Sequence, residues 1–152
     1  MTTRPLAVAV VDTSALVAIL ENEASAAAFL TAFEACHDLR MSAATHLELT
    51  LVVRAKKGGN GLTLLDELLR ALRIGIEPFT YQSHGLLARM GAIHFGKGVH
   101  PAALNFGDLF SYATALALDA PLFFQGFDFR QTDVRDAMQD LGDPFSTGRP
   151  SV

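Results

Sequence analysis

Several features that would narrow the function are missing from this 152-residue chain. It contains one cysteine, which excludes an intramolecular disulfide and a zinc site built from paired thiolates. Charged residues make up only 18% of the chain, and the formal net charge of -4 argues against binding nucleic acid through bulk electrostatics. The longest apolar runs, such as residues 6–11, are far shorter than the roughly 20 residues that span a bilayer.

The start of the chain lacks the pattern of a signal peptide. Residues 1–5 carry one arginine and lead into six apolar residues that end at Asp12, with no longer hydrophobic core and no small-residue cleavage site. The sequence therefore predicts a soluble, cytoplasmic protein with no membrane segment. Half of the residues are hydrophobic and the length suits one domain, so we expect a self-sufficient core.

Short apolar runs alternate with helical patterns along the chain. Strands are expected at residues 6–11, 38–42, 74–79 and 121–124, and helices at 14–20, 24–36, 43–57, 62–73, 82–95 and 108–118. This order predicts right-handed βαβ crossovers and a three-layer α/β/α domain around a central parallel sheet of about four to five strands. The domain is expected to cover residues 1–141, followed by a loosely held tail over residues 142–152.

The most informative feature is a set of carboxylates placed within apolar sequence. Asp12 follows six apolar residues at the end of the first expected strand, the edge at which open α/β sheets bind ligands. Glu48 lies in a helix segment that is apolar nearly all round, where burying an unpaired charge is costly. Asp108 begins another apolar helix, and Asp128 lies between two phenylalanines just past the last strand. We expect these four acids to converge.

Each acid also has a purely structural explanation. Asp12 and Asp108 would serve as helix N-caps, a position that aspartate favours. Glu48 could pair with a basic residue such as Arg54, Asp128 could belong to a turn, and Asp133 is a natural N-cap. These explanations must account separately for each acid at a strand end or an apolar helix face. One shared metal ion accounts for all of them together.

Clustered carboxylates repel one another unless a cation lies between them. Mg²⁺ or Mn²⁺ prefers oxygen ligands and keeps several waters, so two or three side chains suffice as direct ligands. Such an ion lowers the pKa of a bound water and orients it for attack on a phosphodiester. The sequence therefore predicts a metal-dependent phosphodiester hydrolase that needs no covalent nucleophile.

The segments around these acids, namely residues 10–16, Glu48, residues 106–114 and residues 124–134, resemble the motifs of PIN-domain proteins in order and spacing. More narrowly they resemble VapC toxins, the ribonuclease halves of bacterial type II toxin–antitoxin modules. The resemblance implies that Asp12 and Asp108 are the principal metal ligands. It implies that Glu48 is a ligand or water-activating acid and that Asp128 is the fourth acid.

The same resemblance assigns supporting roles and partners. Ser14 would support Asp12 or the substrate phosphate. Family members commonly carry Asn or Asp before the Asp-Phe pair, where this chain carries Phe127, so Asp133 is an alternative fourth acid. The resemblance further implies a homodimer, an RNA substrate, and a cognate VapB antitoxin that inserts a segment into the active-site groove.

An RNA substrate needs cations along its groove. Among the basic residues near the expected site, we expect Arg54, Lys97 and Arg130 to contact the substrate. Two other functions compete with the ribonuclease. A phosphatase with Asp12 as nucleophile is disfavoured, because Ser14 stands where the haloacid-dehalogenase family needs a second aspartate. The other is a catalytically inactive PIN-like binding module.

Overall fold

A computed structural model of the chain describes residues 5–142, and the predicted tail lies outside this part except for Gly142. Its four strands are β1 (Leu6–Val11), β2 (Cys36–Ser42), β3 (Gly75–Glu77) and β4 (Leu122–Phe123). They form one parallel sheet in the order β3-β2-β1-β4. The predicted parallel sheet is confirmed. Because β1 is central, the residue that follows it emerges in the middle of the carboxyl edge.

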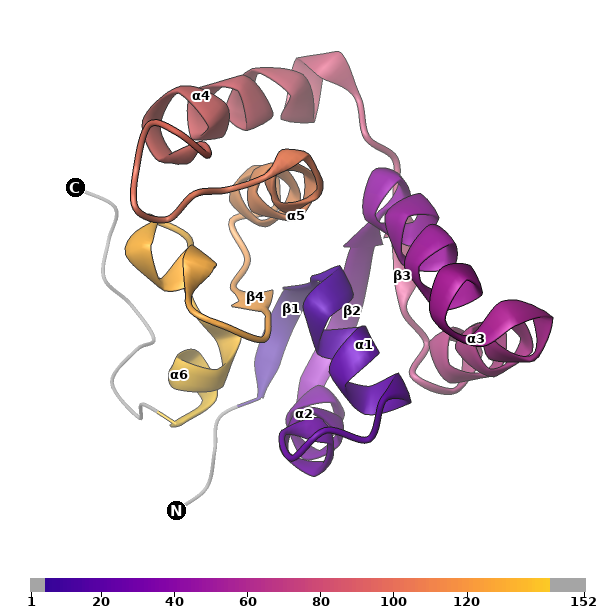
Figure 1. Ribbon diagram of the computed structural model, residues 1–152. Helices are drawn as coiled ribbons and strands as arrows, with labels where there is room; N and C mark the ends of the chain where they lie inside the picture. Colours follow the sequence, from indigo (N-terminus) through magenta and orange to yellow (C-terminus); the bar gives the residue numbers. More distant parts are fainter. Residues whose placement is uncertain (1–4, 143–152) are drawn as a thin grey trace.

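Helices cover both faces of this sheet (Figure 1). The α-helices are α1 (Thr13–Leu20), α2 (Ala26–Glu34), α3 (Ala43–Ala71), α4 (Leu86–Phe95), α5 (Phe106–Ala117) and α6 (Ala137–Gly142). A π-helical turn, η1 (Tyr81–Gly85), and a 3₁₀ turn, η2 (Asp128–Gln131), complete the described elements. Helices α1, α2 and α3 pack on one face, while α5 packs on the other with α4 outside it. The three-layer α/β/α architecture is confirmed.

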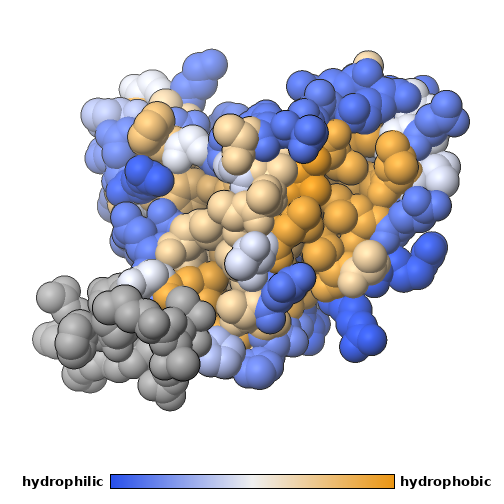
Figure 2. Space-filling model, turned by 90° about the horizontal axis from the view of Figure 1, so that it is seen from below, coloured by the Kyte–Doolittle hydropathy of each residue, from blue (hydrophilic) through white to orange (hydrophobic). Residues whose placement is uncertain are grey.

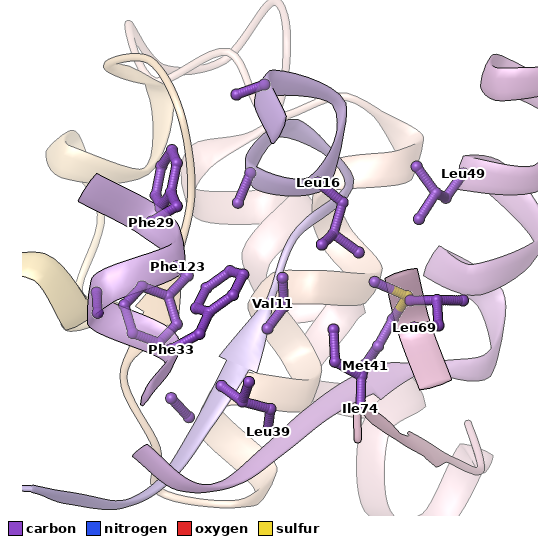
Figure 3. Packing of buried hydrophobic residues seen from close by; sticks show 14 of the residues in the cluster. Val11, Leu16, Phe29, Phe33, Leu39, Met41, Leu49, Leu69, Ile74 and Phe123 are labelled. Carbon is purple, nitrogen blue, oxygen red and sulfur yellow. The ribbon is translucent and has the colours of Figure 1, made fainter. Parts of the chain in front are cut away.

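The apolar strand residues pack into two cores, one on each side of the sheet. Ala9 and Val11 face the first core, shown in Figure 3, while Val10 faces the second. The rings of Phe33 on α2 and Phe123 on β4 meet edge to face, with their centroids 4.9 Å apart. Burial on both faces explains why β1 is valine-rich without alternation, and it gives the residue after Val11 a rigid support.

Several element boundaries differ from the sequence prediction; for example, β2 already begins at Cys36, which was expected in a helix. Helix α5 begins at Phe106 with Asn105 as its N-cap, two residues before the predicted start at Asp108. The short helix α6 was not predicted. The break expected at residues 58–61 is confirmed, because α3 consists of two helical runs joined at Gly58, whose backbone is left-handed with φ of 66°. Only glycine adopts such a conformation without steric cost.

Apolar side chains also reach the surface around α2, at the bottom of the molecule (Figure 2). Alanines of α2 and the side chains of Met138 and Leu141 on α6 line an open cavity of about 440 Å³ there. Within residues 5–142, no helix is both long enough and apolar enough to cross a membrane.

Candidate active site

Asp12 leaves the end of β1 directly into α1, as predicted, and is 4% exposed. One carboxylate oxygen, Oδ2, accepts hydrogen bonds from the backbone N–H of Ser14 at 3.1 Å and from its hydroxyl at 2.6 Å. The other, Oδ1, accepts from the hydroxyl of Ser111 on α5 at 2.5 Å. Asp12 is therefore an N-cap, as the structural explanation expected, but its second oxygen points to α5. Although Asp12 is buried, it forms no ion pair with a positively charged side chain among residues 5–142.

Glu48 comes from the first half of α3 and is held by α1 and α5. The hydroxyl of Thr13 donates to its Oε1 at 2.6 Å. Its carboxylate lies directly against the backbone of Gly107, where a Cβ atom would overlap both carboxylate oxygens and the carbon between them. The absence of a side chain at position 107 therefore creates the space that Glu48 occupies. Glu48 reaches the start of α5 for this reason.

Asp108 is the third residue of α5 and belongs to a capping box. Its carboxylate accepts from the backbone N–H of Asn105 at 3.0 Å, and the side chain of Asn105 accepts from its backbone N–H at 2.9 Å. The N-cap is therefore Asn105, so the explanation of Asp108 as an N-cap is wrong. Partial burial, opposed by the hydrogen bond from Asn105, raises the pKa of Asp108 to about 6.

Three further carboxylates also raise the pKa of Asp108 by repulsion, namely Asp12, Asp128 and Glu48. These three acids are thus near enough to Asp108 to act on it electrostatically. They come from the end of β1, the first half of α3 and η2. Acids from three segments that are distant in the sequence therefore act on the start of α5.

The two candidates for the fourth acid have different surroundings. Asp128 is the first residue of η2, is exposed, and acts electrostatically on Asp108. Asp133 accepts a hydrogen bond from the hydroxyl of Tyr112 at 2.7 Å. Burial of Tyr112 and this bond to Asp133 raise the tyrosine pKa. The surroundings therefore favour Asp128 as a member of the site and give Asp133 a structural contact.

None of the ion pairs among residues 5–142 includes any of the four acids. The suggested pairing of Glu48 with Arg54 is therefore not formed. An all-oxygen donor set with uncompensated repulsion fits a hard divalent cation such as Mg²⁺ or Mn²⁺. In the described part of the chain, no group of three or more His, Cys, Asp or Glu side chains is placed to hold a metal ion, so the expected convergence of the four acids is not complete in this structure. Mg²⁺ suits such an open site because it usually retains several waters.

The predicted substrate cations lie farther out. Arg54 is exposed on α3, and Lys97 is exposed in the loop after α4. Arg130 lies on η2 with its Nε 3.8 Å from a carboxylate oxygen of Asp136. Its guanidinium also lies over the ring of Phe127, at 5.3 Å from the centroid. Among the three, Arg130 is therefore the one placed beside a site acid in the sequence, Asp128.

Sequence analysis missed three residues that shape this site. Thr13 orients Glu48, Ser111 orients Asp12, and Gly107 makes room for Glu48. The sequence does contain a signal for Ser111. Ser111 is a polar residue three positions after Asp108 on a largely apolar helix, so it lies on the same helix face as Asp108. Ser14 was predicted, and it also accepts from the backbone N–H of Gln125 at 3.0 Å, which ties α1 to the segment after β4.

The chain is similar to known proteins over most of its length. The family profile described as PIN domain matches residues 9–135. Ribonuclease VapC28 of Mycobacterium tuberculosis is 41% identical over 130 residues, which are 85% of this chain and 97% of that protein. Ribonuclease VapC30 of the same species is 42% identical over 125 residues, which are 82% of this chain and 95% of that protein.

Two solved structures share the fold. One is VapBC2 from Rickettsia felis bound to a DNA fragment from its promoter, with a TM-score of 0.64 and 22% identity, covering 85% of this chain and 96% of that chain. The other is VapC20 of Mycobacterium tuberculosis, described as a sarcin-ricin loop cleaving toxin. It has a TM-score of 0.67 and 14% identity, and covers 83% of this chain and 95% of that chain.

Proposed function

The chain belongs to the PIN-domain family, and from that membership we propose that it is a metal-dependent endoribonuclease, the toxin of a VapBC-type toxin–antitoxin module. Relatives named VapC ribonucleases, 41% and 42% identical over most of the chain, support the activity. The observation that supports the proposal is that Asp12, Glu48 and Asp128 each act electrostatically on Asp108, while none of these four acids takes part in an ion pair among residues 5–142.

We assign Asp12 and Asp108 as the principal ligands of a Mg²⁺ or Mn²⁺ ion. When bound, that ion supplies a water of lowered pKa and shields the phosphate charge. Glu48 then serves as a further ligand or accepts the proton of the attacking water. Asp128 closes the site from η2 as the fourth acid.

Hydroxyl groups hold these carboxylates in place. Ser14 and Ser111 each donate to one oxygen of Asp12, and Thr13 donates to Glu48. These bonds fix both oxygens of the buried carboxylate and so reduce the reorganisation needed when substrate binds. Because both oxygens of Asp12 accept hydrogen bonds and the hydroxyls of Ser14 and Ser111 are engaged in donating them, water is the attacking group in this assignment.

The proposal extends to the substrate and partners. The phosphodiester substrate is RNA, contacted by Arg54, Lys97 and Arg130, and the cognate partner is a VapB-type antitoxin. A second copy of the chain forms a homodimer. Apolar surface for these protein contacts is present around α2 (Figure 2) and along α4, where Leu86, Met90 and Ile93 are about half exposed. An RNA-cleaving toxin of this kind acts in the cytoplasm, where its substrate is.

The decisive experiment is cleavage of a mixed set of structured RNAs with Mg²⁺ or Mn²⁺, with EDTA, and with the Asp12→Asn variant. We expect cleavage by the unaltered protein only when a divalent ion is present, and loss of cleavage in Asp12→Asn. The matched control is Asp66→Asn, because Asp66 is exposed on the second half of α3. Cleavage that survives both chelation and Asp12→Asn would exclude the mechanism. A protein that cleaves no RNA would instead be the inactive binding module.

A further inference from the structure

Two large aromatic side chains that are close in sequence to Asp108 and Asp128 stand exposed. The ring of Phe106 belongs to a residue that is 79% exposed, and Phe106 lies two positions before Asp108. Phe127 is 73% exposed and directly precedes Asp128. These are the two most exposed of the large hydrophobic residues among positions 5–142. Burying either ring in the fold would have been favourable, so their placement at this edge needs an explanation.

Phe106 is held in place by other aromatic rings although its surface is open. Its ring meets that of Phe110 nearly perpendicularly, with centroids 4.8 Å apart. Phe110 in turn packs against Phe79 at 4.9 Å, and Phe79 stacks on the buried ring of His84 at 5.1 Å. A row of four rings therefore runs from the protein interior to the exposed Phe106. The row supports Phe106 from one side and leaves the remainder of its surface to a ligand.

Phe127 is supported in a different way. The guanidinium of Arg130 lies over one face of its ring, 5.3 Å from the centroid, in a cation–π contact. Arg130 is itself directed by Asp136, at 3.8 Å from its Nε. One face of Phe127 is thus covered by a cation that can also meet a phosphate. With 73% of the residue exposed, the rest of the ring is open to solvent.

The chemistry of an aromatic ring limits what it can recognise here. A phenyl ring binds neither the metal nor a phosphate oxygen, but it stacks well on the flat face of a nucleobase. In a continuous RNA duplex the faces of the bases are covered by their neighbours, so only an unpaired base offers a face to such a ring. Stacking is tolerant of sequence, since every base has a π-face.

From this arrangement we propose that Phe106 and Phe127 stack on unpaired bases that flank the scissile phosphodiester. This inference rests on the proposed ribonuclease function and assigns two residues that position its substrate. The rings act by positioning the nucleotides and not in the chemical step. Their loss should therefore raise KM more than it lowers kcat.

The test compares the unaltered protein with Phe106→Leu and Phe127→Leu, which keep an apolar side chain and remove the ring. Stacking on one base is worth about fivefold to a hundredfold in affinity, and we expect kcat/KM on a hairpin cut within its loop to fall by that factor. The variants Phe106→Tyr and Phe127→Tyr keep a ring and should restore cleavage. Leu64→Ala, which truncates an exposed apolar residue on the second half of α3, is the matched control and should cleave normally.

An abasic ribose placed beside the scissile phosphate supplies a second measurement. Removing that base should slow the unaltered protein, but it should have little further effect on the leucine variant that has lost the corresponding ring. Leucine variants that cleave like the unaltered protein, or that are slowed by the abasic site as much as it is, would overturn the proposal. These outcomes leave ribonuclease activity intact. An unaltered protein that cleaves no RNA would refute the proposed function and this inference with it.

Discussion

Replacing Gly107 by alanine should separate the chemistry of the site from the stability of the fold. A Cβ atom at position 107 would overlap the carboxylate of Glu48 and displace it. The residue is helical and buried, with no positive φ, so alanine suits its backbone. The substitution therefore acts almost entirely through the position of Glu48.

The expected stability change is small because two effects oppose each other. Alanine favours the helix over glycine by about 0.8–1.0 kcal/mol. Losing the hydrogen bond from Thr13 to the displaced carboxylate costs about 1.5–3 kcal/mol, as for other bonds to charged groups. The net loss is about 0.5 to 2.2 kcal/mol, which lowers the Tm of a chain of this length by a few degrees.

The expected change in activity is much larger. A displacement of about 1 Å in a catalytic site can cost about a hundredfold in rate, so kcat of Gly107→Ala on RNA should fall by at least about that factor. Thermal unfolding by circular dichroism and single-turnover cleavage measure the two quantities. Gly59→Ala is the matched control, because a Cβ there meets nothing within 4 Å and should leave cleavage unchanged. A Gly107→Ala protein that cleaves at the unaltered rate would refute the placement of Glu48 in the machinery.

Three further predictions follow from the same contacts. With metal removed by EDTA, the Tm should rise as the pH falls from 7.5 to 5. The pKa of Asp108 in the folded protein is raised to about 6, so in this pH range the folded protein binds a proton that the unfolded chain does not bind. The stabilisation from this proton is complete below pH 3.8 and is lost as the pH rises through about 6. Asp108→Asn lacks the titrating carboxyl, so equal profiles of Tm against pH for this variant and the unaltered protein would contradict the prediction. Ser111→Ala should weaken Mn²⁺ binding about tenfold to a hundredfold in calorimetry, because it removes the donor to Asp12, and unchanged affinity would argue against that role. In cleavage assays Asp128→Asn should lose most activity, while Asp133→Asn should keep it. Asp133→Asn should instead lose about 1 kcal/mol of folding stability, because the hydrogen bond from Tyr112 is lost. The reverse pattern of activities would make Asp133 the fourth acid.

Much of the fold could be predicted because its signals are local. The valine-rich run at residues 6–11 predicts a doubly covered strand, and the glycines at 58–61 predict the break in α3. The start of α5 was placed too late because Asn105, which caps the helix through Asp108, stands in a glycine-bearing loop that showed no helical periodicity. Helix α6 has only six residues, too few to show a period.

The acids proposed for the site stand out in the sequence for a different reason. A carboxylate within apolar sequence is conspicuous, as Asp12 and Glu48 are. The residues that position them are not conspicuous, since Thr13 and Gly107 acquire their roles only when α1, α3 and α5 meet in space. The contact of Asp133 could not be predicted either, because the hydroxyl of Tyr112 that donates to it lies 21 positions earlier in the sequence.

The account depends most on four carboxylates sharing one divalent cation. Calorimetric titration of Mn²⁺ into the unaltered protein, Asp12→Asn and the control Asp66→Asn measures this directly. We expect saturable binding to the unaltered protein and to the control, and its loss in Asp12→Asn. Equal Mn²⁺ affinity in all three proteins would contradict the shared site, whatever the relatives of this chain do.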